Sequence, residues 1–175
     1  RHDFEDNYCC VESEPLYVGS VLEQIDMEYY PEDYNPPYTG PTWHVSTSGS
    51  DDNDGSEESP FATIQVGIDA SSDGDTVLVA AGNYIEIVNY GEKNITLQGE
   101  DKTTTIIDGN ASGTVVTMGK GVLDGFTITN GSSGGVQIDN YSTFHPVISN
   151  AIISGNTSSG NGGGVEGGGS EGGDI

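Results

Sequence analysis

The side chains with the clearest potential for chemistry lie in an acidic loop, residues 48–58, with the sequence SGSDDNDGSEE. Carboxylates at this density favour calcium, a hard cation that takes oxygen ligands. A loose Ca²⁺ site would use Asp51, Asp52, Asp54 and Glu57. The alternative, which we favour, is a solvated turn with Asx hydrogen bonds that leads into a helix N-terminus, where negative charge is stabilising.

The spacing within this loop excludes an EF-hand. Asp52, Asp54 and Gly55 match part of a D-x-D-G calcium loop, but Ser50 stands at the first ligand position. The twelfth position needs a bidentate acid and holds Phe61. The sequence therefore suggests Ca²⁺ as a cofactor through the looser arrangement alone, and it suggests no other cofactor.

Five N-x-S/T sequences would accept N-linked glycans in a source that performs this modification. They begin at Asn94, Asn110, Asn130, Asn140 and Asn156. Asparagine, serine and threonine are also the residues that tight corners use, so turn chemistry alone produces the same pattern. Glycosylation is therefore one of two interpretations of these sites.

The histidines and cysteines form no metal-binding pattern. His2, His44 and His145 lie far apart in the sequence, so we expect each to be structural or exposed. Cys9 and Cys10 are adjacent, and a disulfide between neighbours is strained. We expect each to remain a thiol, to pair with another chain or to be modified.

Composition excludes several classes of partner. The 175-residue chain has 4 Lys and Arg against 28 Asp and Glu, for a formal charge of −24. Four cations cannot form the basic stripe that nucleic acid or an anionic membrane surface requires. No apolar run approaches the roughly 20 residues of a membrane-spanning helix. The hydrophobic fraction is only 33%, which favours a core of thin repeated layers over one with buried helices.

Residues 1–42 predict an extended acidic arm or linker. This segment holds ten acids and one base, and four of the seven prolines lie between Pro31 and Pro41. Six of the nine tyrosines also lie here, namely Tyr8, Tyr17, Tyr29, Tyr30, Tyr34 and Tyr38. Because aromatic side chains fill gaps between subunits, we expect these tyrosines to dock on a neighbouring copy and so to serve assembly. The alternative is an arm that folds back on its own solenoid.

The next segment predicts short strands around one helix. Ser59-Pro60 predicts a helix start, with Ser as N-cap and Pro in the first turn. Phe61, Ile64 and Ile68 then share one helical face. Apolar, β-branched runs predict strands at residues 43–45, 76–80, 84–88, 94–97 and 104–107.

Residues 109–175 hold 18 of the 27 glycines and repeat internally. The recurring unit consists of an apolar strand, an Asn/Gly turn, a Ser pair and Gly-Gly-Val. The two Gly-Gly-Val units end at Val136 and Val165 and are 29 residues apart. This period predicts a β-solenoid. Alternate residues such as Phe126 and Ile128 then point inward and stack between rungs, while glycine and asparagine take corners with positive φ. The helix over residues 60–70 would cap the first rung.

Several motifs follow one another in a fixed order, namely W-H-V-S, N-D-G, S-P-F-A-T-I-Q, G-D-T-V-L-V and G-N-Y. After them come I-T-L-Q-G-E-D, T-T-I-I-D-G and L-D-G-F-T-I-T-N-G. In these motifs and in their order, residues 43–165 resemble secreted bacterial right-handed parallel β-helix proteins of the pectin-lyase-like superfamily. The resemblance implies an all-β, right-handed parallel β-helix with an N-terminal amphipathic capping helix. Gly67 departs from the pattern, because this helix usually carries alanine there.

Enzymes of this fold are mostly polysaccharide lyases and inverting glycosidases, so the resemblance raises a carbohydrate-active alternative. A lyase acting on uronates needs cations, and the solenoid offers only Lys93, Lys102 and Lys120. A hydrolase needs two acids on one face. Asp108 and Asp124 both precede glycine, which is typical of strand-ending turns. We therefore assign no catalytic residue, and the sequence leans against an enzyme.

The sequence thus predicts an arm, residues 1–42, and a parallel β-helix, residues 43–175, with rungs over about 75–165 and a glycine-rich tail at 166–175. The chain begins at Arg1, so we expect either that a signal peptide has been removed or that the chain is a fragment. Our first functional hypothesis is a secreted or cell-surface structural or adhesive protein that self-assembles into a fibre or layer through its arm and open solenoid ends. The alternatives are a carbohydrate-active module that takes glycans as partners, and a fragment of a larger adhesin.

Overall fold

The computed structural model describes residues 38–139, 145–158 and 163–168. The chain divides into two units, and the described residues belong to the second, Pro36–Ile175. The predictions for the arm's tyrosines up to Tyr34, for His2, Cys9 and Cys10, and for Asn140 lie outside the described residues. The arm's boundary at residue 42 stays a prediction.

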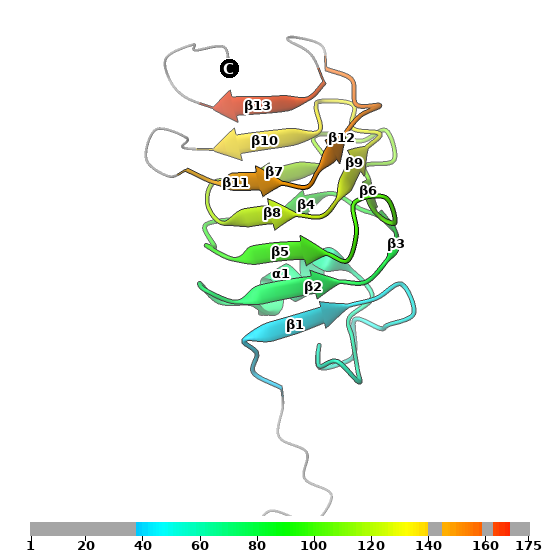
Figure 1. Ribbon diagram of the computed structural model, residues 1–175, viewed down its shortest axis with the longest axis vertical. Coiled ribbons are helices and arrows are strands. Elements are labelled where there is room, and N and C mark those ends of the chain that lie inside the picture. The colour runs from blue at the N-terminus through cyan, green and yellow to red at the C-terminus, as the bar shows by residue number, and fades with distance from the viewer. Residues whose placement is uncertain (1–37, 140–144, 159–162, 169–175) are drawn as a thin grey trace, which may run out of the picture. The chain divides into compact units, whose positions relative to one another are not determined.

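The described residues form a right-handed parallel β-helix built from three stacked sheets (Figure 1). Sheet A contains β1 (Thr42–Val45), β2 (Thr76–Val79), β5 (Thr96–Gly99), β8 (Val122–Asp124) and β11 (Val147–Ser149). Sheet B contains β3 (Gly82–Ile85), β6 (Thr105–Asp108), β9 (Thr127–Thr129) and β12 (Ile152–Ile153). Sheet C contains β4 (Val88–Asn89), β7 (Val116–Met118), β10 (Val136–Asp139) and β13 (Val165–Gly168). Every pair of neighbouring strands in these sheets is parallel, which confirms the predicted fold class.

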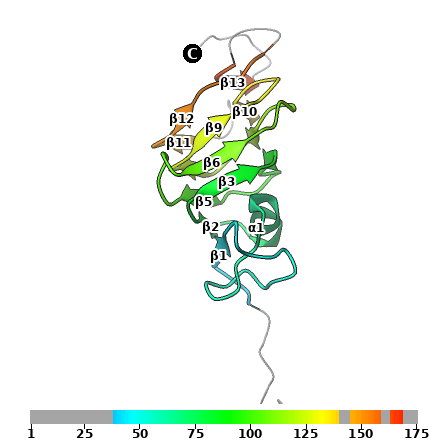
Figure 2. The same ribbon diagram turned by 90° about the vertical axis from the view of Figure 1, so that its right-hand side faces the viewer.

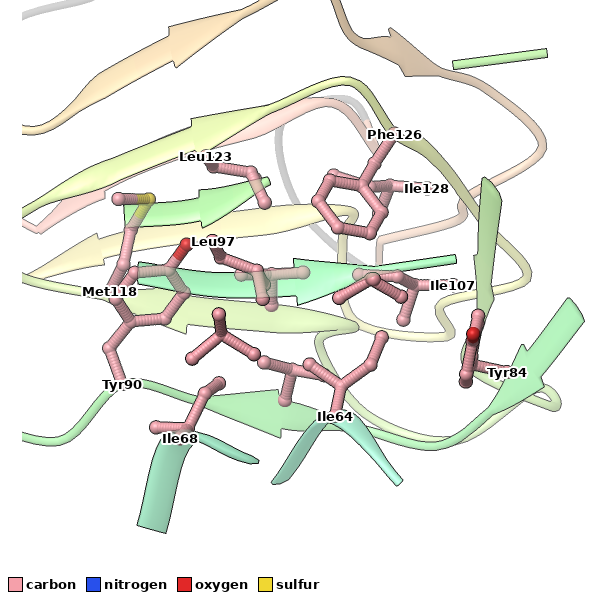
Figure 3. Close-up of a cluster of buried hydrophobic side chains, with 14 of the residues drawn as sticks. Ile64, Ile68, Tyr84, Tyr90, Leu97, Ile107, Met118, Leu123, Phe126 and Ile128 are labelled. Carbon is pink, nitrogen blue, oxygen red and sulfur yellow. The ribbon is translucent and has the colours of Figure 1, made fainter. Parts of the chain in front are cut away.

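The core is a set of apolar columns that run from rung to rung. In sheet A, Val77, Leu97 and Leu123 occupy matching positions and are completely buried. Phe126 and Ile128 are also completely buried, as the alternation predicts. Figure 3 shows Leu97, Leu123, Phe126 and Ile128 directed into one interior, with Ile64 and Ile68 of the helix below them. Each rung therefore depends on its neighbours for burial.

The corners use glycine and asparagine with positive φ, as predicted. Asn110, Asn130 and Asn150 have φ values of 49°, 59° and 44°, and Gly125 has 82°. The predicted internal repeat is confirmed by the strand register, because β10 and β13 pair with Val136 opposite Val165. The repeat in the sequence is thus one turn of the solenoid.

The capping helix α1 (Ile64–Ala70) begins later than the Ser59-Pro60 pattern predicts. Its N-cap is Thr63, and Phe61 lies outside it, in a parallel bridge with Val45. The Phe61 ring stacks on Trp43, with centroids 6.0 Å apart. The prediction was wrong because Phe61 pairs with β1 as an extended residue, so the helix cannot start there.

The helix packs closely on the first two strands of sheet A, and Figure 2 shows it beside β1 and β2. A Cβ atom at Gly67 would lie 2.9 Å from methyl groups of both Val45 and Val77. Such a contact is shorter than van der Waals packing allows, so glycine permits this approach where alanine would push the helix away. Glycine at position 67 therefore suits the close packing of the helix on sheet A.

Candidate functional site

The acidic loop is tied to the N-terminus of the capping helix. The backbone N–H groups of Ala62 and Thr63 each donate to Oδ1 of Asp51 at 2.9 Å, and the Thr63 hydroxyl donates to the same carboxylate. Asp54 accepts hydrogen bonds from the N–H and the hydroxyl of Ser56, which is an Asx turn, and these bonds lower the pKa of Asp54. The loop thus has the turn-and-helix arrangement that we favoured.

The four acids proposed as Ca²⁺ ligands are not gathered into one site. In the part of the chain that the structure describes, no three His, Cys, Asp or Glu side chains lie close enough to hold a metal ion. Asp51 points to the helix and Asp54 to its own turn, while Asp52 and Glu57 are exposed. The carboxylates of Asp51 and Asp54 therefore bind backbone N–H groups of their own chain.

Glu86 completes the cap, although the sequence predicted no role for it. Its two carboxylate oxygens accept hydrogen bonds from the N–H groups of Ile64, at 2.9 Å, and Gln65, at 3.0 Å. Asp51 and Glu86 together satisfy four consecutive backbone donors, from residue 62 to residue 65. Strand alternation offered a clue, because Glu86 can point inward only if Ile85 and Ile87 are exposed, as they are at 65% and 43%.

Burial raises the pKa of Glu86 above its ordinary value. The two backbone donors oppose this rise, and the nearby Asp51 carboxylate adds to it. The folded protein therefore retains the Glu86 proton at a pH where the unfolded chain has lost it. By linkage, this group favours folding below its unfolded pKa, and its contribution is lost as the pH rises through the higher folded pKa.

We predict that wild type loses stability relative to Glu86→Gln as the pH rises from about 4 to 7, the ordinary range of carboxyl titration. The glutamine lacks one acceptor, which lowers its stability by an amount that does not depend on pH. Urea midpoints of both proteins, measured at intervals over this range, test the trend. Parallel curves would mean that Glu86 titrates alike in the folded and unfolded states.

The other end of the helix is held by a lysine. Nζ of Lys93 donates to the carbonyl oxygens of Ile68, Asp69 and Ser71 at 2.6 to 2.8 Å. A cation at a helix C-terminus is stabilising, because the last carbonyls carry partial negative charge. The helix thus has carboxylates at one end and an ammonium group at the other. Lys93, one of the few cations that a lyase could use, is bound to the helix.

The two aspartates considered for hydrolysis are engaged in the corners. Oδ1 of Asp108, the last residue of β6, accepts hydrogen bonds from the Asn110 N–H and from Nδ2 of Asn130. Oδ1 of Asp124, at the end of β8, accepts from Nδ2 of Asn150 and from the Ser149 hydroxyl. Each carboxylate therefore links its own corner to the next rung.

The described sequons divide into two groups. Asn94 and Asn110 are exposed. Nδ2 of Asn130 donates to Asp108, and Nδ2 of the half-buried Asn156 donates to the carbonyl of Ile128 at 3.0 Å. Since Nδ2 is the atom that carries an N-linked glycan, Asn130 and Asn156 have structural roles that a glycan would disturb.

A groove of about 510 Å³ lies on the outer face of sheet A near the N-terminal end. Its lining includes His44, Ser46, Glu57, Leu78, Gln98 and Glu100. His44, Leu78 and Gln98 are in register on β1, β2 and β5, so their side chains line one outward column. The strand pairing brings together residues that are up to 54 positions apart in the sequence, between 44 and 98.

The fold and cap define a class, a right-handed parallel β-helix closed at its N-terminal end by a short helix. Residues 47–98 match the model of a family described as a protein of unknown function, DUF1565, which is associated with parallel β-helix proteins. The matched residues include the acidic loop, α1, Glu86 and Lys93, and therefore most of the cap. No curated protein and no solved structure matches the chain. Within the described residues, no helix has the length and apolar character needed to cross a membrane.

Proposed function

We propose that this chain is an extracellular or cell-surface structural or adhesive β-helix protein that associates with copies of itself. One observation supports the proposal: the charged side chains best suited to sugar chemistry are engaged in holding the fold. Lys93 fastens the capping helix, and Asp108 and Asp124 link adjacent rungs. A solenoid in which these charged side chains stabilise the fold is suited to a mechanical or display role.

The proposed assembly uses the open solenoid end and the arm. Tyr38 contacts Trp43 of its own chain edge to face, with ring centroids 5.3 Å apart, and its hydroxyl donates to the carbonyl of Thr42. Tyr38 therefore belongs to the base of the solenoid. The other tyrosines of the arm are the ones that we assign to contacts between copies. Because each copy carries a charge of −24, Ca²⁺ or other cations would promote the association.

Electron microscopy and light scattering of the purified chain test this proposal. We expect assemblies larger than one chain, which weaken when a chelator removes Ca²⁺ or when low salt restores the repulsion between copies. A chain that stays monomeric at every salt and calcium concentration would contradict the proposal. Fractionation of the source cells tests the location, which we expect to be outside the cytoplasm.

A second candidate, a glycan-binding or carbohydrate-cleaving module, is favoured by the groove on sheet A. Its side chains combine hydrogen-bonding groups, such as Gln98 and Ser46, with the apolar Leu78. Neutral oligosaccharides are the ligands to test, because acidic glycans would be repelled. Binding that is lost in Gln98→Ala, together with release of reducing ends, would favour this candidate over the structural one.

A further inference from the structure

The groove on sheet A has a floor of three strands and a wall formed by the acidic loop. His44, Leu78 and Gln98 lie side by side on β1, β2 and β5 and form the floor. The N–H of His44 donates to the carbonyl of Gly55, so the loop runs along the side of β1 that does not face β2. The volume of about 510 Å³ is in the range of ligand-binding pockets.

Two carboxylates line this groove, one at each end of the floor. Glu57 belongs to the loop beside β1, and Glu100 follows β5, which is two strands away. Neighbouring strands are about 4.8 Å apart, so the two ends of the floor are separated by about 10 Å. Oε2 of Glu100 accepts a hydrogen bond from the N–H of Ala81 at 2.9 Å, which holds this carboxylate at the rim.

The rest of the lining suits the stem of a basic side chain. Leu78, Ala80 and Pro60 supply apolar surface between the two carboxylates. Lysine and arginine bury their methylene groups along such surface and keep the charged group at its edge. Among the described residues that line the groove there is no Lys or Arg to repel a cation. The same residues include no Phe, Tyr or Trp, so a flat ring finds no aromatic face to stack on.

The charge of the whole chain favours the same class of partner. A formal charge of −24 attracts cations and repels anions, and a groove with carboxylates at both ends strengthens this field locally. A second copy of the chain is a poor source of cations, because each copy holds only 4 Lys and Arg against 28 Asp and Glu. The complementary charge must therefore come from a different protein.

From these observations we infer that the groove binds an extended basic segment of another protein. Its lysine stems lie on the apolar floor, and its ammonium groups meet Glu57 and Glu100. Alternate side chains of an extended segment share one face at a spacing of about 7 Å, so two of them, with flexible stems, can reach both carboxylates. The inference rests on the adhesive role in the proposed function, and it names the class of partner for that role.

Calorimetry and NMR titration of the full chain with a matched pair of peptides test the binding. The first peptide is tetralysine with blocked termini, and the second is the same peptide acetylated on every side chain, which keeps the backbone and the stems but removes the charges. We expect tetralysine to shift the amide resonances of His44, Leu78 and Gln98. We expect the acetylated peptide to bind roughly tenfold more weakly or less tightly still, and added salt to weaken the binding of tetralysine.

A matched set of protein variants separates the groove from the general attraction of an acidic chain. Glu57→Gln and Glu100→Gln each remove one negative charge from the groove, and we expect each to weaken tetralysine binding by roughly three- to tenfold. Glu58→Gln removes the same charge from an exposed neighbour that does not line the groove, and we expect it to change binding by less than about twofold. Circular dichroism checks that all three variants keep the fold.

Several results would overturn the inference. If Glu58→Gln weakens binding as much as Glu57→Gln does, the attraction is diffuse and the groove is not the site. If the acetylated peptide binds as tightly as tetralysine, the groove does not recognise a cation. If tetralysine fails to bind and a neutral oligosaccharide binds, the groove belongs to the glycan candidate, and if neither binds, both assignments of the groove fail.

Light scattering of the chain alone keeps these failures apart from a failure of the proposed function. A chain that assembles but does not bind tetralysine loses only the basic partner. A chain that binds tetralysine in the groove but stays monomeric loses only self-association.

Discussion

Ile107→Ala should lower the free energy of unfolding by about 2–5 kcal/mol, whereas Ile106→Ala should lower it by about 1 kcal/mol or less. The two isoleucines are neighbours on β6 and face opposite ways. Ile107 is completely buried between Tyr84 and Ile128, which flank it in register, and Ile106 is half-buried on the outer face. Because the residue type and the strand are the same, the change in β-propensity is matched, and the difference reports burial.

Two probes in a urea titration make this measurement informative. The single tryptophan, Trp43, is buried in β1 and reports on the capped end, while circular dichroism reports on all strands. In a solenoid, each rung contacts only its neighbours, so stability need not be uniform along the stack. Coincident transitions would indicate one cooperative unit. Equal losses for the two variants would contradict the inward orientation of Ile107 and the columns built on it.

The fold was predictable because its rules are local. Period-two alternation places Ile107 and Ile128 inside, and glycine or asparagine at the corners supplies positive φ. The recurrence of Gly-Gly-Val gives the length of the last described turn directly, since Val136 and Val165 are partners in adjacent strands. Each of these inferences depends on residues within one rung or on identical residues in the next.

The cap was predictable only in part, since its interactions join distant residues. Glu86 accepts hydrogen bonds from Ile64 and Gln65, and Lys93 donates to carbonyls of the last helical turn. No local pattern pairs these positions. The start of the helix was misplaced for the same reason, because Phe61 pairs with β1 and Asp51 provides the hydrogen bonds that Ser59 was expected to provide. The carboxylates of Asp51 and Asp54 could be recognised as functional groups, but whether they bind an ion or the backbone depends on the loop's path.

The corners between sheets A and B carry the second large effect that we expect. Gly99 and Gly125 follow one another in adjacent rungs, and their backbones are in close contact. A Cβ atom on Gly125 would lie 2.5 Å from the carbonyl oxygen of Gly99. A Cβ atom on Gly99 would lie 2.4 Å from the carbonyl oxygen of Gly125 and 3.2 Å from the Phe126 ring, so glycine at position 99 leaves space for that ring.

Gly125→Ala should therefore lower the free energy of unfolding by about 2–5 kcal/mol, from an L-residue in the left-handed region and from a clash that backbone atoms cannot easily relieve. Gly74→Ala is the matched control. Gly74 has φ of 95° against 82° for Gly125, and no atom lies within 4 Å of its Cβ position, so only the conformational strain of about 1–2 kcal/mol applies. The difference between the two urea-derived stabilities isolates the contact between rungs. Equal losses would mean that the rungs separate to admit a methyl group, and the stack would then be looser than the buried Phe126 ring requires.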